Sequence, residues 1–388
     1  MDFQLSDRLT KLPPYLFVEI DKAKRKAIQA GKDVIDLGIG DPDEASPKEV
    51  IEELYKASQD PCNHHYPLDQ GIPEYRERIA EWYKNRFSVK LDSETEILAL
   101  IGSKEGISHM PLAFINPGDV SLVPDPCYPP YKTGTILAGG VVHIMPLAEE
   151  NNFLPDLKTI KESVLKKAKI LYINYPNNPT ASICEKGFFK DVVSFAKKHN
   201  LVVAHDAAYS EITFDGYRTD SFLKVDGAMD VGVEFHSLSK TCNMTGWRIG
   251  FVCGNKKIVS AIAKVKANID SGVFNVIQHA GIVGLDIAHS YTQKMNNIYQ
   301  ERRDTLVQGL NAMGWTTRKP KATFYVWTRV PKAYKSSIEF ARRVLDKASI
   351  VITPGVGMGE SGEGYVRMAL TVSKERMKQA VDRLKKVI

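Results

Sequence analysis

Short apolar runs alternate with amphipathic stretches through the middle of the chain. Seven runs rich in apolar and β-branched residues predict strands, at residues 97–101, 120–124, 141–145, 170–175, 201–205, 231–236 and 248–253. Stretches such as residues 188–198, with apolar residues on one helical face, lie between several of them and predict helices. This alternation is typical of an α/β domain whose mostly parallel, seven-stranded sheet is buried on both faces.

The pattern changes after about residue 285. A long helical stretch at residues 290–313 precedes two strand-like runs, at 322–330 and 364–370, and a last helical pattern ends the chain. We therefore expect a large domain over residues 46–284. A smaller α+β domain would combine residues 1–45 with residues 285–388.

Composition describes an ordinary globular protein that is soluble in water. The 388 residues are 43% hydrophobic and 25% charged, which allows about two to three domains with sizeable cores. The net charge of +6 comes from 52 basic and 46 acidic residues that are interspersed, as on solvated helix faces. We expect no nucleic-acid groove, which needs concentrated basic residues, and no membrane span, because no apolar run is long enough.

Cysteine usage favours a cytoplasmic protein. The five cysteines are odd in number and form no Cys-x-x-Cys motif, which predicts reduced thiols rather than a disulfide framework or a zinc site. Residues 1–30 are charged and amphipathic and lack the apolar core of a secretory signal. The pair His64 and His65 has no further ligand at a suitable spacing, so we expect no metal.

The run at residues 237–250 carries the most chemistry. Its sequence is Ser-Leu-Ser-Lys-Thr-Cys-Asn-Met-Thr-Gly-Trp-Arg-Ile-Gly, and it follows a predicted strand. The amine of Lys240 could form a Schiff base with an aldehyde, while Arg248 and the hydroxyls of Ser237 and Ser239 could hold a phosphate. Pyridoxal phosphate (PLP) carries both groups. A lysine near an arginine in a loop is usually only a solvated surface pair, so the interpretation depends on the rest of the chain.

Three further loops follow predicted strands and offer partners for the same cofactor. Glycine in residues 102–106 lets backbone N–H groups approach a phosphate at a helix start, although Ser103 could be a plain helix cap. Prolines rigidify residues 125–131, so that Tyr128 could offer its face to a pyridine ring or be a core aromatic. Asn178 could donate to the phenolic oxygen of PLP, or belong to a common Asn-Pro turn.

Two charges occur where an apolar run predicts burial. Asp206 ends the strand at 201–205, and a carboxylate there could keep the pyridine nitrogen protonated; a capping role is the alternative. Tyr209, three residues later, could reach the phenolic oxygen. Arg367 lies inside the strand-like run 364–370 and needs a carboxylate partner. That partner is either a structural salt bridge or the carboxylate of a substrate, and the local sequence does not decide between them.

Together these residues resemble the fold-type I PLP-dependent aminotransferases of the aspartate aminotransferase superfamily, over nearly the whole chain. The run at 237–250 is the most specific part. The resemblance implies that Lys240 forms the Schiff base, Asp206 contacts the ring nitrogen, Tyr209 and Asn178 contact the phenolic oxygen, and Tyr128 stacks on the ring. It also implies a set of phosphate ligands, namely Ser103, Lys104 through its backbone, Ser237, Ser239 and Arg248. Ala181 departs from the glycine that the family often has there.

The same resemblance implies where substrate binds. Arg367 would hold the α-carboxylate, helped by Gly40 and Asn178, and Tyr66 would reach the phosphate from a second subunit. It therefore implies a homodimer with shared active sites. None of this follows from composition.

Within the family, the loops at 102–106 and 125–131 are most similar to the LL-diaminopimelate aminotransferase branch. That likeness implies ping-pong exchange of an amino group between LL-diaminopimelate and 2-oxoglutarate, in lysine biosynthesis. Asp69 and Asn275 of the partner subunit would then contact the distal ammonium and carboxylate, or else be a helix cap and an interface hydrogen bond. Some relatives have a longer glutamate at the position of Asp69. A second substrate arginine is not evident, because four candidates are expected on helix surfaces, namely Arg25, Arg76, Arg78 and Arg86.

Other functions remain open on the same core. The enzyme could be an aminotransferase for aspartate, alanine or an aromatic amino acid, or a PLP-dependent β-lyase that expels a group from the β-carbon. A transcription regulator on the same fold would need an N-terminal helix-turn-helix domain, for which the first ~40 residues leave no room.

Overall fold

The computed structural model describes residues 3–13 and 16–388, and a seven-stranded sheet forms its centre. The strands are β2 (Ile97–Leu100), β3 (Val120–Asp125), β4 (Val141–Pro146), β5 (Ala168–Ile173), β6 (Val202–Asp206), β7 (Gly232–Ser237) and β8 (Gly250–Gly254). Each of them overlaps one of the runs that the hydrophobic pattern predicts. Their spatial order is β2-β8-β7-β6-β5-β3-β4.

The sheet is mixed but mostly parallel, as predicted. Strand β3 pairs in parallel with β4 and β5, and the pairs β5–β6 and β6–β7 are parallel too. Strand β8 runs antiparallel to both β7 and β2. The carboxyl ends of the other strands therefore meet the amino end of β8 at one edge of the sheet, where ligands gather in folds of this kind.

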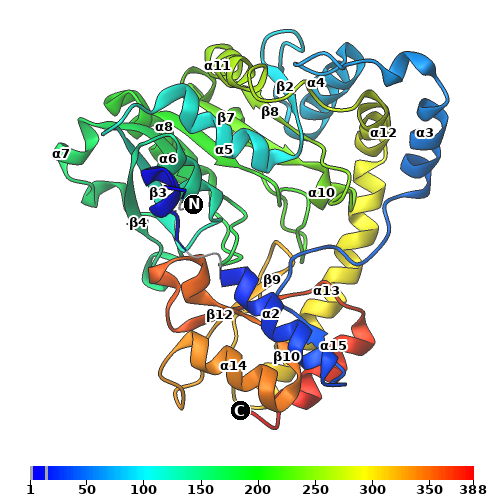
Figure 1. The fold of residues 1–388 in the computed structure, drawn as a ribbon, viewed down its shortest axis with the longest axis vertical. Helices are drawn as coiled ribbons and strands as arrows, with labels where there is room; N and C mark the ends of the chain where they lie inside the picture. Colours follow the sequence, from blue (N-terminus) through cyan, green and yellow to red (C-terminus); the bar gives the residue numbers. More distant parts are fainter. Residues whose placement is uncertain (1–2, 14–15) are drawn as a thin grey trace.

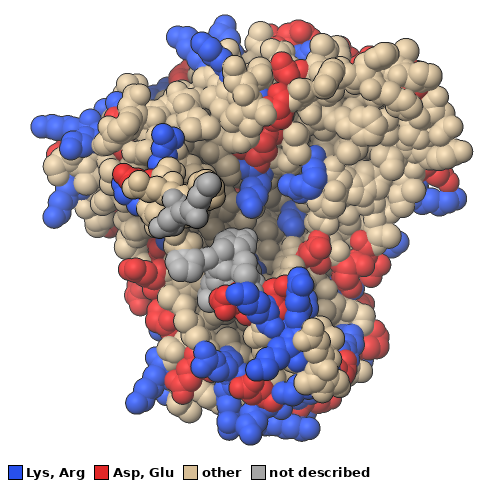
Figure 2. Space-filling view, viewed as in Figure 1, with Lys and Arg blue, Asp and Glu red and all other residues tan. Residues whose placement is uncertain are grey.

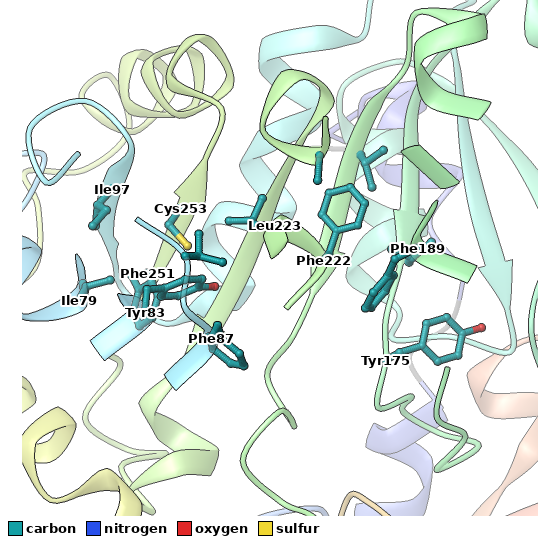
Figure 3. Close-up of a cluster of buried hydrophobic side chains, with 14 of the residues drawn as sticks. Ile79, Tyr83, Phe87, Ile97, Tyr175, Phe189, Phe222, Leu223, Phe251 and Cys253 are labelled. Carbon is teal, nitrogen blue, oxygen red and sulfur yellow. The ribbon is translucent and has the colours of Figure 1, made fainter. Parts of the chain in front are cut away.

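Helices cover both faces of this sheet (Figure 1). One face packs against α5 (Ser103–Phe114), α6 (Pro130–Leu137) and α11 (Lys256–Lys266). The other packs against α3 (Lys48–Ser58), α4 (Pro73–Phe87), α8 (Lys186–His199) and α12 (Asn275–Asp286). Figure 3 shows part of this second core, in which Tyr83 and Phe87 of α4 lie beside Phe251 of β8, while Phe189 of α8 lies near Phe222. Burial on both faces explains why the strands read as continuous apolar runs.

The C-terminal part forms a separate core with the segment around β1 (Ile35–Asp36). It contains α13 (Ala288–Ala312), β9 (Tyr325–Arg329), α14 (Ser337–Ala348), β10 (Ile350–Val351), β11 (Thr353–Pro354), β12 (Tyr365–Ala369) and α15 (Lys374–Leu384). Strands β11, β12 and β9 form an antiparallel sheet, while β1 pairs in parallel with β10. Figure 1 shows α13 running down from the large sheet into this part, where it packs against α15, and α2 (Leu16–Gln29) also lies in this lower part. The domain boundaries at 45/46 and 284/285 stay predictions.

The remaining elements are short connectors. They are α1 (Asp7–Thr10), η1 (Pro61–His64), η2 (Glu149–Asn151), η3 (Leu157–Thr159), α7 (Glu162–Leu165), η4 (Phe222–Lys224), α9 (Ala228–Val231), α10 (Leu238–Thr241), η5 (Gly355–Met358) and η6 (Glu360–Gly362). All five cysteines are free thiols. Within residues 3–13 and 16–388, none of the helices combines the length and the apolarity that crossing a membrane requires.

Candidate active site

The residues singled out in the sequence converge at the edge of the sheet where the parallel strands end. Gly102 follows β2, Tyr128 follows β3, Asn178 follows β5, Asp206 ends β6, and Lys240 follows β7 within α10. Figure 2 shows a recess between the upper and lower parts of the molecule, with Lys and Arg side chains at its margin. Such a margin attracts anionic ligands.

Lys240 has a half-buried amine that is held by the backbone. Its Nζ donates a hydrogen bond to the carbonyl oxygen of Gly40 at 2.9 Å and lies 5.3 Å from the centre of the Phe324 ring. Burial lowers the pKa of Lys240 to about 8; Asp41 opposes this shift, and Arg367 and Arg248 add to it. A larger fraction of the amine is therefore neutral near pH 7, which is the form that attacks an aldehyde or accepts a proton.

Asp206 is buried with its carboxylate fixed from two sides. The hydroxyl of Tyr131 donates to Oδ2 at 2.7 Å, and the backbone N–H of Ala208 donates to Oδ1 at 3.2 Å. Burial raises the pKa of Asp206, while these two hydrogen bonds counter that shift because they stabilise the ionised form. A cationic N–H group facing this carboxylate would find an oriented acceptor, and the role of Asp206 toward a ring nitrogen stays a prediction.

Tyr131 is a site residue that the sequence did not identify. Its ring stacks on that of Tyr172, with centroids 5.0 Å apart and planes 14° from parallel, and meets Tyr128 edge-on at 5.9 Å. The apolar stack buries the Tyr131 hydroxyl, and a buried hydroxyl needs a partner. Only that general expectation, applied to the aromatic residues of 125–131, could have drawn attention to it.

Arg367 is buried on β12 and contacts several neutral groups. Its Nη1 donates to Oδ1 of Asn178 and its Nη2 to the carbonyl oxygen of Gly38, both at 2.8 Å. Thr353 Oγ1 lies 3.5 Å from Nη2. These three oxygens orient the planar guanidinium, and its assignment as a ligand for the substrate carboxylate stays a prediction.

Tyr325 is a second site residue that the sequence did not identify, and it contacts both Tyr209 and Gly40. The two tyrosine hydroxyls lie 3.0 Å apart, and burial, the largest cause, holds the pKa of Tyr209 well above its usual range. Tyr209 therefore keeps its proton and can donate it in a hydrogen bond. Tyr325 lies in a strand that reads as plain core, so no local signal identifies it.

The turn before α5 brings together hydrogen-bond donors that suit an anion. Gly102, rather than Ser103, is the N-cap residue; it has φ +74° and no side-chain cap, which makes the cap interpretation of Ser103 wrong. A Cβ at Gly102 would lie 2.5 Å from Nη2 of Arg248. The guanidinium and the first N–H groups of the helix therefore face the same space. Buried Ser237 pairs with Gly250, whose added Cβ would lie 3.0 Å from the backbone nitrogen of Ser103, and Ser239 is buried two residues later. This donor set fits a phosphate dianion. The Lys104 side chain is exposed, so only its backbone belongs here.

Tyr66, Asp69 and Asn275 lie apart from this cluster. Within the described part of the chain, no hydrogen bond joins them to Lys240 or Asp206. Tyr66 is 90% exposed and Asp69 is exposed. The loop that carries Tyr66 and Asp69 lies beside the segment that precedes Asn275 at the start of α12, because a Cβ at Gly272 would lie 2.8 Å from the carbonyl oxygen of Leu68. The Oδ1 atom of Asn275 is buried and has no hydrogen-bond partner among the described residues.

Arg76 is buried, so the prediction that it lies on a helix surface, made for it and three other arginines, is wrong. That residue is 4% exposed on α4, and it donates to the carbonyl oxygens of Gly71, at 3.2 Å, and Ser93. Arg86 is half-buried against Glu211, with Nε 3.1 Å from both carboxylate oxygens. Both side chains are thus engaged in holding loops together.

Comparison with known proteins extends this picture. The chain matches the family model described as aminotransferase class I and II over residues 32–384. It is 51% identical over 385 residues to an LL-diaminopimelate aminotransferase from Moorella thermoacetica, with 99% of this chain and 98% of the relative covered. It is 52% identical over 383 residues to an LL-diaminopimelate aminotransferase from Aquifex aeolicus, with 99% of each covered.

Solved structures agree with these sequence relatives. A substrate-bound structure of BacF from Bacillus subtilis superposes with a TM-score of 0.96 at 36% identity, covering 100% of this chain and 98% of that one. A mutant aspartate aminotransferase from Thermus thermophilus gives a TM-score of 0.93 at 27% identity, with 100% of each chain covered.

Proposed function

The chain belongs to the aminotransferase class I and II family, and we propose on that premise that it is a PLP-dependent LL-diaminopimelate aminotransferase. It would transfer an amino group from LL-diaminopimelate to 2-oxoglutarate, forming glutamate, in cytoplasmic lysine biosynthesis. One observation carries the proposal: proteins with that name are about half identical to this chain over nearly all of its length. The site geometry is the independent support.

PLP fits the residues at the sheet edge. When bound, it supplies an aldehyde carbon and a protonated ring that withdraws electron density from the α-carbon of an amino acid. The phosphate would bind the N–H groups of Ser103 and Lys104 with Ser237, Ser239 and Arg248. Asp206 would hold the ring nitrogen, Tyr128 would pack on the ring, and Tyr209 and Asn178 would contact the phenolic oxygen.

Arg367 would bind the substrate, and Lys240 would transfer its proton. Arg367 binds the α-carboxylate through its planar fork, beside Gly40, and this orients the α-hydrogen. The neutral amine of Lys240 would then accept the α-proton and hold it as the general acid and base of the site. A pKa of about 8 suits a general base that works near neutral pH. Burial of Arg367 and Asp206 excludes water from both charges and strengthens their contacts.

A second subunit would complete the site. Tyr66 is 90% exposed, and the loop that carries it lies beside Gly272, in a segment whose apolar Ile269 and Phe274 are also exposed. A patch of this kind is typical of an interface. In a homodimer, Tyr66 would reach the partner's phosphate site, while Asp69 and the unpaired amide oxygen of Asn275 would face the distal ammonium of the substrate.

Steady-state kinetics would test the choice of substrate. We would measure glutamate formation from 2-oxoglutarate with LL-diaminopimelate, aspartate, alanine, phenylalanine and cystathionine. The proposal predicts a kcat/KM for LL-diaminopimelate at least about a hundredfold above that for alanine, because a site that pairs a distal charge rejects substrates lacking it. Asp69→Ala should reduce this ratio. A preference for aspartate, alanine or phenylalanine would contradict the substrate assignment, and release of pyruvate and ammonia from cystathionine would indicate a β-lyase.

A further inference from the structure

Tyr325 touches three separate pieces of the site. It lies on β9 and is 3% exposed. Its hydroxyl lies 3.0 Å from that of Tyr209, and its ring lies 4.2 Å from the guanidinium carbon of Arg367. A Cβ at Gly40 would come within 1.9 Å of the same hydroxyl, so the backbone of Gly40 packs directly against it. Gly40 in turn accepts the hydrogen bond from Lys240.

The sheet register explains how one ring reaches these groups. Tyr325 pairs with Ala369 across the β9–β12 ladder, and Arg367 lies two residues before Ala369. Residues two apart on a strand point to the same face, so Tyr325 and Arg367 are diagonal neighbours. The guanidinium lies over the ring within the range of a cation–π contact. The preceding residue, Phe324, has its ring 5.3 Å from Nζ of Lys240.

We propose that Tyr325 is a positioning residue for transamination, whose hydroxyl orients Tyr209 and whose ring supports Arg367. This inference rests on the proposed function, because it assigns Tyr209 to the phenolic oxygen of PLP and Arg367 to the substrate carboxylate. If Tyr209 donates its proton to the cofactor, its own oxygen must accept the hydrogen bond from Tyr325. A donor bonded in this way polarises Tyr209 and makes it a stronger donor.

Two substitutions separate the two roles. Tyr325→Phe removes the hydroxyl and keeps the ring beneath Arg367. Tyr325→Leu removes both, although it still fills apolar volume. Tyr334→Phe is the matched control, since its hydroxyl donates to the carbonyl oxygen of Val387 at 2.7 Å in the same part of the fold, away from these groups. Tyr209→Phe reports the effect of losing the contact to PLP itself.

The hydroxyl is tested by titrating the visible absorption band of the PLP-loaded protein with pH. Weaker stabilisation of the phenolic oxygen makes the cofactor hold its proton to higher pH. In Tyr325→Phe we expect the midpoint to rise by about half a pH unit, the size of a modest hydrogen-bond effect. Tyr209→Phe should move it further in the same direction. Turnover should fall in Tyr325→Phe with little change in KM.

The ring is tested with pimelate, which has both carboxylates of diaminopimelate but no amine that can react. Calorimetry should give a Kd about tenfold higher for Tyr325→Leu, since a desolvated cation–π contact is lost. The Kd of Tyr325→Phe should stay within about twofold of the unsubstituted protein, because its ring remains. Tyr334→Phe should change neither the Kd nor the titration midpoint.

The outcomes distinguish this inference from the proposed function. A normal titration midpoint in Tyr325→Phe, with a shifted one in Tyr209→Phe, would overturn the role of the hydroxyl. Unchanged binding of pimelate to Tyr325→Leu would overturn the role of the ring. If the unsubstituted protein showed no visible band with PLP, the proposed function would fail and this inference with it.

Discussion

At the scale of single residues, the charged groups of the site form hydrogen bonds with neutral groups. Lys240 is held by a backbone carbonyl, Arg367 by an amide and a carbonyl, and Asp206 by a phenol and an N–H group. Such hydrogen bonds fix the direction in which each charged group points. Burial then changes the proton affinity of the groups, downward for Lys240 and upward for Asp206.

The lowered pKa of Lys240 predicts how the protein takes up its cofactor. Only the neutral amine attacks the aldehyde, so the rate at which protein freed of PLP regains its visible band should rise with pH and level off above about 8. An ordinary lysine would keep accelerating toward pH 10.5. Stopped-flow absorbance at several pH values measures this, and Lys240→Ala should give no band. A rate that still rises steeply above pH 9 would contradict the assignment.

Tyr131→Phe should alter the pH dependence of turnover. The hydroxyl at 2.7 Å stabilises the ionised form of Asp206, so its loss raises the pKa of that carboxyl further. The acid limb of the kcat profile should then move to higher pH, and kcat should fall about tenfold, since a hydrogen bond to a charge contributes ~1.5–3 kcal/mol. Tyr172→Phe, which keeps the stacked ring, serves as control. Superimposable profiles for Tyr131→Phe and the unsubstituted protein would refute this role.

The sequence identified the charged residues of the site, which lie in or next to predicted strands. It did not identify the tyrosines whose hydroxyls and rings contact the site residues. Lys240, Asp206 and Arg367 are polar residues within or next to apolar runs, which is a local signal. Tyr131 and Tyr325 resemble core aromatics, and their partners Asp206 and Tyr209 lie 75 and 116 residues away. Only tertiary packing brings them together.

At the scale of elements, each long strand follows from its apolar run, within two or three residues at either end. The two-residue strands β1, β10 and β11 are too short to produce any periodicity. The antiparallel direction of β8 was also not readable, because burial on both faces gives parallel and antiparallel strands the same apolar pattern. The loops after the strands were the informative parts, since they carry the residues of the site.

The turn between β2 and α5 gives a prediction at this scale. Gly102→Ala places a methyl group 2.5 Å from Arg248 at a positive φ, so the arginine must move away from the anion space. The Kd for PLP should rise at least tenfold, since a charge-assisted contact of ~1.5–3 kcal/mol is disturbed. Gly118→Ala is a matched control, having φ +91° and no atom near its added Cβ. Equal PLP affinity in the two variants would contradict the phosphate assignment.

At the scale of the whole molecule, the site lies between two cores and would need a second chain. Strand β12 carries Arg367 in one part of the fold, while in the other part Asp206 ends β6 and Lys240 follows β7. Contacts between the two parts include Glu149 of η2, which accepts from Tyr365 at 2.8 Å and from Arg329 at 2.7 Å. Tyr66 and Asp69 are exposed, and in the proposed homodimer they would complete the site of the partner subunit.

Shared active sites predict complementation between two inactive variants. Lys240→Ala and Tyr66→Ala would each lose activity at limiting PLP. Co-expressed with different tags, they should form mixed dimers in which one site combines the intact Lys240 with the intact Tyr66. Activity should then return to about a quarter of the normal value, because half of the dimers have one good site. If purified mixed dimers were as inactive as the parents, Tyr66 would serve only its own subunit.

The central claim is that Lys240 and its neighbours transfer the amino group of LL-diaminopimelate through PLP. Its most direct test is a half-reaction, in which PLP-loaded protein is mixed with LL-diaminopimelate alone while the visible absorption band is followed. We expect the band to disappear, 2-oxoglutarate to restore it, and alanine or aspartate to have little effect. A band that persists with LL-diaminopimelate but disappears with aspartate or alanine would contradict it.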